Sequence, residues 1–263
     1  MAQVINTNIM SLNAQRNLNR TNQGLSSALQ RLSSGLRINS SMDDAAGLAI
    51  AQKMDSQIRG MTVAARNASD GISYAQTADN TLAIVSDQLQ RMRELATQSL
   101  NGTLSDTERT KIDQEFQALH AEAARIQGSA KLNGMSVFAT FDFQVGAEAT
   151  DTISGSFDSV TIAAINVSTT GDAADALSSI DTALGLVATH RATIGGMQSR
   201  LNFTISYLEG AIENQSAAKS RIMDADFAAE TAALTRAQIL QQAGTAMVSQ
   251  ANSIPQNVLT LLR

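Results

Sequence analysis

The sequence predicts a mainly α-helical protein: a long antiparallel coiled coil or helical bundle, a small β-hairpin region, and terminal helices that form a separate inner coiled coil. Hydrophobic residues make up 43% of the 263 residues but aromatic residues only 3%, so aliphatic side chains carry the apolar surface. The chain contains a single proline, as long uninterrupted helices require. Apolar residues also recur at spacings of three and four, which is the helical period.

The clearest periodic stretch lies in the C-terminal half and predicts a helix over residues 172–222. Nine of its eleven core-spaced positions are apolar: Leu177, Ile180, Leu184, Val187, Ile194, Leu201, Ile205, Leu208 and Ile212. The two exceptions are Arg191 and Gln198. Polar residues at such positions usually fix the register of a coiled coil at a cost in stability.

Two further helices are expected to pack beside it. Residues 44–100 have the same rhythm of three and four, at Ile72, Ala75, Leu82, Val85, Leu89, Met92 and Ala96. Asn101-Gly102 ends that helix, and Ser105 with Glu108 forms a capping box that starts a helix over residues 104–128. Together with the 172–222 helix they predict a wall domain over residues 44–223.

Between the helices, the apolar period changes from 3.6 to 2 and predicts a small β region over about residues 135–168. Met135, Val137, Phe141, Phe143 and Val145 occupy alternate positions after an Asn-Gly turn signal. A second run, from Ile153 to Val167, is rich in Ile, Val, Thr and Ser. We expect one hairpin-based sheet and no further globular domain, because the interval is too short for one.

Each chain end has an apolar stripe at helical spacing. The N-terminal stripe is Leu18, Leu25, Leu29, Leu32 and Leu36, and the C-terminal stripe is Leu240, Met247, Ala251, Ile254, Val258 and Leu261. They predict a discontinuous domain made of residues 1–43 and 224–263. The stripes could cover each other in a bundle, or contact other molecules, because exposed apolar patches usually mark interaction sites. Pro255 would kink the second helix or cost it a backbone hydrogen bond.

A helix break separates the N-terminal stripe from the long helix that follows. Residues 37–43 are expected to connect the two layers. Ser41 is the predicted cap of the following helix, with Asp43 and Asp44 in its first turn near the positive end of the helix dipole.

Charge and motifs exclude several function classes. The net charge is −5, without the basic footprint of a nucleic-acid-binding protein, and no stretch of 18 apolar residues predicts membrane insertion. The start of the chain lacks the pattern of a cleavable signal, so we expect a soluble protein. We expect no enzyme activity, metal or cofactor: His120 and His190 lie 70 residues apart, cysteine is absent, and Ser216 with Lys219 forms only a common tetrad. Asp224 and Asp226 near Asp43 and Asp44 are explained more simply by helix capping than by a cation site.

Several segments carry a resemblance to a known family. QRLSSGLRINSSMDDAAGLAIA, residues 30–51, closely resembles the signature segment of bacterial flagellins, and MAQVINTN and VLTLLR resemble that family's two termini. DGISYAQTADN and LQRMREL are similar to flagellin as well. The resemblance implies a secreted, extracellular structural subunit of the bacterial flagellar filament, polymerising through its terminal coiled coils. The short middle implies a minimal form without outer domains. A hook–filament junction protein and a cell-surface flagellin-like adhesin are the alternatives.

The resemblance also implies partners and sites. The partners are other copies of the chain in a helical filament, an export chaperone and the flagellar secretion apparatus, the filament cap and hook-junction proteins, and two immune receptors. The expected polymerisation interface is Leu18, Leu25, Leu29, Leu32, Leu36, Leu240, Met247, Ile254, Val258 and Leu261. The surface resembling the one recognised by the animal Toll-like receptor for flagellin is Leu89, Gln90, Arg91, Leu95 and Glu115. The segment resembling the ligand of a plant receptor kinase is Gln30, Arg31, Leu32, Gly35, Arg37, Asn39, Asp43, Asp44, Gly47 and Leu48, with Ser41-Met42 departing from the usual pair.

Overall fold

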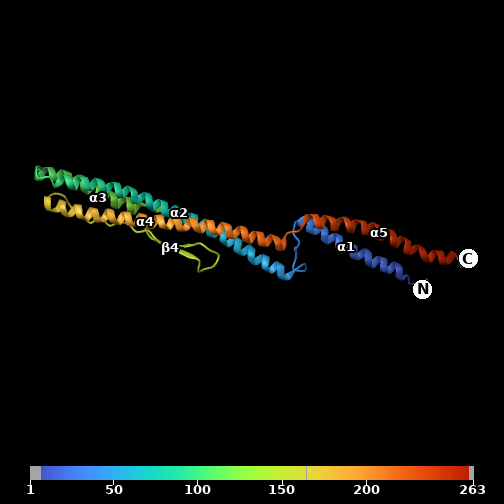
Figure 1. Ribbon diagram of the computed structural model, residues 1–263. Coiled ribbons are helices and arrows are strands. Elements are labelled where there is room, and N and C mark those ends of the chain that lie inside the picture. The colour runs from blue at the N-terminus through green and yellow to red at the C-terminus, as the bar shows by residue number, and fades with distance from the viewer. Residues whose placement is uncertain (1–6, 164, 261–263) are drawn as a thin grey trace. The chain divides into compact units, whose positions relative to one another are not determined.

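A computed structural model describes the backbone of residues 7–163 and 165–260 and the side chains of residues 7–163 and 165–253. Helices dominate this part of the chain (Figure 1), as predicted. The helices are α1 (Ile9–Ser34), α2 (Ala45–Ser99), α3 (Asp106–Ser129), α4 (Thr170–Met223) and α5 (Phe227–Thr260). The strands are β1 (Lys131–Leu132), β2 (Met135–Ser136), β3 (Thr140–Gln144) and β4 (Thr152–Ser156).

The three central helices begin and end within two residues of the predicted positions, a normal difference at helix termini. The chain divides into two compact units, Met1–Ser56 with Asn214–Arg263, and Gln57–Glu213. These borders fall within α2 and α4, whereas the predicted domain borders at 43/44 and 223/224 fall at the breaks between helices. The assignment of the two domains therefore stays a prediction.

The core of the second unit lies between α2, α3 and α4. Six of the α2 positions singled out in the sequence are fully buried: Ala75, Leu82, Val85, Leu89, Met92 and Ala96. Phe116 of α3 and Ile180, Val187 and Leu201 of α4 pack into the same cluster. Each large aliphatic side chain buried in this way stabilises the folded chain by about 1.5–3 kcal/mol relative to an exposed one. The helical bundle is thus held by the periodic residues.

The buried face of α4 is wider than a two-stranded coiled coil requires. Ala176, Ala183 and Met197 are buried beside the predicted positions, and Met197 lies against Gly155 of β4. Arg191, one of the two polar exceptions, is exposed, and its Nε donates to Asp79 Oδ1 of α2 at 2.8 Å. The arginine therefore pairs across the two helices at the edge of the core.

The β region forms two separate two-stranded sheets, so the prediction of one sheet is wrong. β1 and β2 form one antiparallel pair around Asn133 and Gly134, whose φ angles of 51° and 79° suit a tight hairpin turn. β3 and β4 form a second antiparallel pair, in which Phe143 lies opposite Ile153. Met135, expected on the buried side, is 55% exposed.

The run that follows β4 is held by a helix rather than by a strand. Side chains from one face of α3 bond to the backbone of residues 160–167. The pairs are Asp113 Oδ1 with Val167 N at 2.8 Å, Gln117 Nε2 with Ile165 O at 2.7 Å, His120 Nε2 with Ile162 O at 3.3 Å, and Gln127 Oε1 with Val160 N at 2.7 Å. Because these bonds satisfy polar backbone groups, the residues of this segment that the structure describes pack against α3 without a strand partner.

In the first unit, α1 ends at Gly35, whose φ of 69° is the left-handed conformation that glycine adopts easily. The chain then runs beside the end of α4. Leu36 forms a β-bridge with Asp224, and Arg37 N donates to Met223 O at 2.6 Å. The Arg37 guanidinium donates to Ile222 O at 2.7 Å. These bonds fix the connector where α1 gives way to α2.

The start of α2 corrects the predicted cap. Because the helix begins at Ala45, Ser41 is too far upstream, and Asp44 Oδ1 instead accepts from Gly47 N at 2.9 Å. Asp43 lies outside the helix. Its Oδ2 accepts from the backbone N–H of Asn39 and Ser40 at 3.1 and 2.9 Å, and these bonds lower the pKa of the Asp43 carboxyl.

Candidate functional site

The two chain ends pair within the first unit. α1 and α5 lie side by side (Figure 1), and polar contacts along them fix an antiparallel register. These contacts join Asn8 Nδ2 to Ala251 O at 2.7 Å, Ser11 Oγ to Asn252 Oδ1 at 2.7 Å, Asn22 Oδ1 to Gln241 Nε2 at 3.0 Å, and Arg31 Nη1 to Glu230 Oε1 at 4.0 Å. Within the described residues, most positions of the two predicted stripes thus lie on a pair of helices that contact each other.

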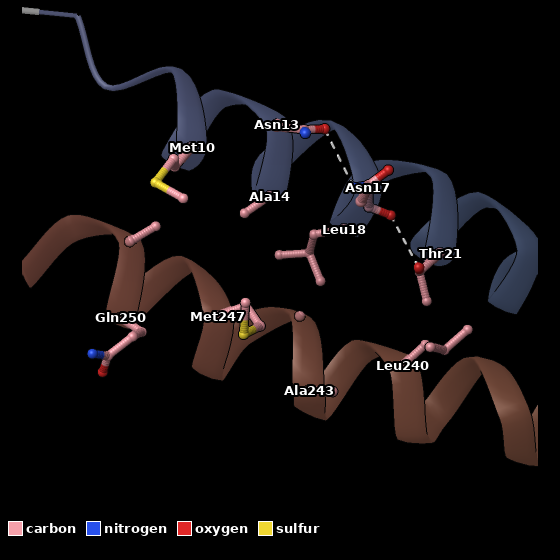
Figure 2. Close-up of a pocket in the computed structure, with 12 residues that line it drawn as sticks. Met10, Asn13, Ala14, Asn17, Leu18, Thr21, Leu240, Ala243, Met247 and Gln250 are labelled. Carbon is pink, nitrogen blue, oxygen red and sulfur yellow. Dashed lines mark hydrogen bonds between the residues drawn. The ribbon is translucent and has the colours of Figure 1, made fainter. Parts of the chain in front are cut away.

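A groove of about 440 Å³ runs between these two helices. Its apolar lining comes from both: Met10, Ala14 and Leu18 of α1, and Leu240, Ala243 and Met247 of α5 (Figure 2). Gly244 lies against Leu18, where a Cβ would meet Leu18 Cδ1 at 3.1 Å. The absence of a side chain at Gly244 allows the helices to approach closely at this point.

The pairing of α1 and α5 leaves much of their apolar surface uncovered. Of the predicted interface, Leu18, Leu25, Leu32 and Leu36 are half-buried, whereas Leu29, Leu240 and Met247 are 50–62% exposed. The side chains of Ile254 and Val258, and all of Leu261, lie outside the described residues. The predicted contact between the stripes is thus observed in part, and the helices still present apolar faces to the surroundings, whereas their contact with other molecules stays a prediction.

Sequence reasoning missed other exposed apolar residues on the same helices. They are Ile9, Met10, Leu12, Phe227 and Ile239, each more than half exposed in this chain. They lie on helix positions next to the predicted stripes. A search for apolar residues spaced three or four apart along one helix face therefore does not include them. A broader search for apolar residues in helices of low charge would have found them.

The predicted animal-receptor surface consists of exposed polar residues and buried leucines. Arg91 is exposed, and its guanidinium donates to Glu115 Oε1 on α3 at 2.9 Å and to Glu94 Oε2 at 2.9 Å. The hydrogen bonds to Glu94 and Glu115 raise the pKa of Arg91. Leu89 and Leu95 are 0% and 2% exposed, which corrects their prediction as surface contacts: both fill the core beneath the arginine. Gln90 is exposed beside Arg91.

The segment similar to the plant-receptor ligand is a folded connector in this chain. Gln30, Arg37, Asn39, Asp43 and Asp44 are exposed. Arg31, Leu32, Gly35 and Leu48 are half-buried. Gly47 is buried, and a Cβ there would lie 2.5 Å from Asp44 Oδ2. Several of these residues thus have a structural role in shaping the turn between α1 and α2.

Several of the residues considered for chemistry have structural partners. Lys219 Nζ contacts Asp55 Oδ1 at 2.5 Å, and Asp226 Oδ1 accepts from Ala228 N at 2.9 Å at the start of α5. His120 and His190 are half-buried, on different helices. Within residues 7–163 and 165–260, no group of three or more metal-binding side chains occurs, and no helix is long and apolar enough to cross a membrane.

Paired terminal helices with uncovered apolar faces, in a chain that also contains a well-filled helical bundle, are features of a structural protein. Comparison with known families identifies the particular one. The bacterial flagellin N-terminal helical region matches residues 5–142, and the bacterial flagellin C-terminal helical region matches residues 177–262. The chain belongs to the bacterial flagellin family.

Individual relatives agree along the full length. The chain is 44% identical to a flagellin of Halalkalibacterium halodurans, an alignment that covers 99% of this chain and 100% of the relative. It is 40% identical to the flagellar filament 33 kDa core protein of Treponema phagedenis, over 99% and 100% of the two chains. The alignment with flagellin B of Vibrio cholerae, at 34% identity, spans 377 positions, so that relative contains segments that this 263-residue chain lacks.

A solved structure supports the fold. The crystal structure of Bacillus cereus flagellin matches with a TM-score of 0.50 and 28% sequence identity, covering 54% of this chain and 88% of that one. Flagellins are a family of structural proteins, in agreement with a helical bundle that carries a small β region.

Proposed function

We propose that this flagellin is a structural subunit of the bacterial flagellar filament and polymerises through α1 and α5. The observation that carries the proposal is the uncovered apolar surface of the paired terminal helices. Contiguous exposed apolar surface is unusual on a protein that remains a monomer. The neighbouring copies in a helical polymer would cover it, and the family and its relatives support this assignment over the junction-protein and adhesin alternatives.

The energetics suit folding that is coupled to assembly. Ordering the terminal backbone costs about 1–2 kcal/mol per residue, and a lone pair of helices recovers only part of this cost through mutual contact. Additional burial of apolar surface contributes roughly 25 cal/mol per Å². In the proposed mechanism the ends are largely unfolded in the free subunit and become ordered when neighbours cover their exposed faces.

The finer proposals concern place and partners. The subunit would leave the cell through the flagellar secretion apparatus, bound by an export chaperone, and would assemble outside beneath a filament cap and beyond the hook-junction proteins. Recognition by the animal Toll-like receptor for flagellin would use the exposed Gln90, Arg91 and Glu115. Recognition by a plant receptor kinase would use the segment of residues 30–51. A synthetic peptide of that sequence, applied to leaf tissue, tests this proposal. The absence of an oxidative burst would contradict it.

Electron microscopy after seeded assembly tests the proposed function. The full chain is compared with a variant lacking residues 241–263 and with Leu240→Ser, which makes one exposed α5 position polar. Phe203→Ser is the matched control, because Phe203 is 77% exposed but lies on α4, outside the terminal pair. Circular dichroism checks that each variant keeps its helical bundle.

Filaments from the full chain and from Phe203→Ser, with none from the truncated chain and fewer from Leu240→Ser, would support the proposal. Failure of the full chain even with filament seeds would favour an adhesin or junction protein. Normal filaments from the truncated chain would remove α5 from the assembly mechanism.

A further inference from the structure

Two methionines lie at the groove between α1 and α5. Met10 comes from the first turn of α1 and Met247 from the middle of α5, and both line the groove together with Leu18 (Figure 2). Their exposed fractions are 59% and 62%, although methionine is a side chain that usually fills apolar interiors. They are thus accessible thioethers on the surface that the proposed function assigns to assembly.

We propose that Met10 and Met247 form an oxidation-sensitive site that controls assembly of the subunit. The oxidant is hydrogen peroxide. The methionine sulfur attacks one peroxide oxygen, the O–O bond breaks, the sulfur becomes a sulfoxide, and the other oxygen leaves as water. The reaction replaces a flexible apolar side chain with a polar one, which is unfavourable at an apolar interface.

Exposure and position together distinguish these two residues from Met42, Met92, Met135 and Met197. Met92 and Met197 are 0% and 6% exposed in the bundle core, so peroxide has little access to them. Met42 and Met135 are 93% and 55% exposed but do not line the groove. Oxidation of the chain therefore affects two kinds of exposed methionine, and only one kind lies on the terminal helix pair.

The effect on assembly rests on the proposed function. Apolar contact between copies would cover Met10 and Met247, whereas in the free subunit both are accessible whether the terminal helices are paired or unfolded. The state of the two sulfur atoms would then decide whether a subunit can join a filament. A subunit already in a filament would be protected.

The test uses full-length protein treated with hydrogen peroxide, with oxidation of each methionine followed by peptide mass spectrometry and assembly followed by seeded sedimentation. Met10→Leu/Met247→Leu removes both sulfur atoms while keeping apolar side chains of similar volume. Met42→Leu/Met135→Leu is the matched control. Oxidised wild-type protein and the oxidised control should need a roughly tenfold higher subunit concentration to assemble, the change typical of an unpaired polar group at an interface. Oxidised Met10→Leu/Met247→Leu should assemble like its untreated form.

Recovery of assembly after treatment with methionine sulfoxide reductases A and B would support the proposal, since the two enzymes together reduce both sulfoxide epimers. Unchanged assembly of oxidised wild-type protein would overturn it, and so would an equal loss in oxidised Met10→Leu/Met247→Leu. If that variant fails to assemble even without peroxide, the second measurement is how far filament formation protects Met10 and Met247 from oxidation. Equal oxidation of the two residues in wild-type filaments and in free subunits would overturn the proposal. If untreated wild-type protein fails to assemble with seeds, the proposed function fails. The oxidation site is tested separately: slower oxidation of Met10 and Met247 than of the buried Met92 would overturn it.

Discussion

Arg91 shows how one exposed residue can be both structural and available to a partner. Its guanidinium bridges Glu94 on its own helix and Glu115 on α3, while Leu89 and Leu95 pack into the core below it. Exposed ion pairs generally contribute little to stability, because water screens them and ordering long side chains costs entropy. The three charged groups are therefore free to change without loss of the fold.

At this scale we predict the effect of exchanging the charges. Arg91→Glu should reduce signalling through the animal Toll-like receptor for flagellin at least about tenfold, the effect of losing a charge pair at an interface. The exchange Arg91→Glu/Glu115→Arg restores an α2–α3 ion pair but presents it in reverse, so it should not restore signalling. A reporter-cell assay measures the response, and thermal denaturation should show little change in either variant. Recovered signalling in the double variant would contradict recognition of these residues by the receptor.

At the scale of elements, α3 provides hydrogen bonds that a strand would otherwise provide. Gln127 is 7% exposed, and its side-chain amide bonds to both the N–H and the C=O of Val160, at 2.7 and 3.1 Å. The long helices could be predicted because their periodic residues meet each other. The division of the β region could not, because the polar partners of residues 160–167 are α3 side chains that show no β pattern.

Gln127→Leu should therefore destabilise the second unit more than its conservative size suggests. The substitution leaves the buried Val160 N–H and C=O without partners, at a cost of about 1–3 kcal/mol. Urea denaturation measures the free energy of unfolding, and hydrogen exchange should show faster exchange of the Val160 amide. Gln114→Leu is the control, since Gln114 is exposed on the same helix. An equal and small effect of both substitutions would argue against the role given to α3.

Local apolar spacing predicts helix packing better than it predicts helix caps or exposed surfaces. The apolar spacing predicts that α2 and α4 pack together. The family resemblance, by contrast, implies a receptor surface that includes Leu89 and Leu95, and both side chains are buried. The cap of α2 was placed at Ser41 because serine is a favourable cap, yet the helix begins only after Asp44. Ile9 and Ile239 fall outside the single line of helical spacing that defines each stripe, and their exposure follows from the helix faces that remain unpartnered in the structure.

For the whole molecule, several carboxyl groups link stability to pH in the same direction. Backbone and side-chain hydrogen bonds lower the pKa of Asp43 and of Glu108, and the arginine partners Arg125 and Arg93 lower those of Glu122 and Asp181. A carboxyl with a lowered pKa in the folded state stabilises the fold above its unfolded pKa. That contribution is lost as the pH falls through the folded pKa.

We therefore expect the melting temperature to be nearly constant from pH 7 to pH 5. It should decrease once the pH is lower than the ordinary pKa values of 4.5 for Glu and 3.8 for Asp. Circular dichroism melts at pH 7, 5, 4 and 3 measure this dependence. Glu108→Gln, which removes one of the groups, should lower the melting temperature at pH 7 and reduce the drop between pH 5 and pH 3. A rise in melting temperature on acidification would show that other groups dominate.

The pairing of α1 with α5 has a consequence for how the molecule comes into being. Ser11 and Asn252, which bond across the pair, are 241 positions apart in the chain. This contact cannot form until residues 11 to 252 are all present, since closing so long a loop requires both partners. A fragment that stops before Asn252 therefore lacks this contact, although it can contain the helices of the central bundle, which end at Met223.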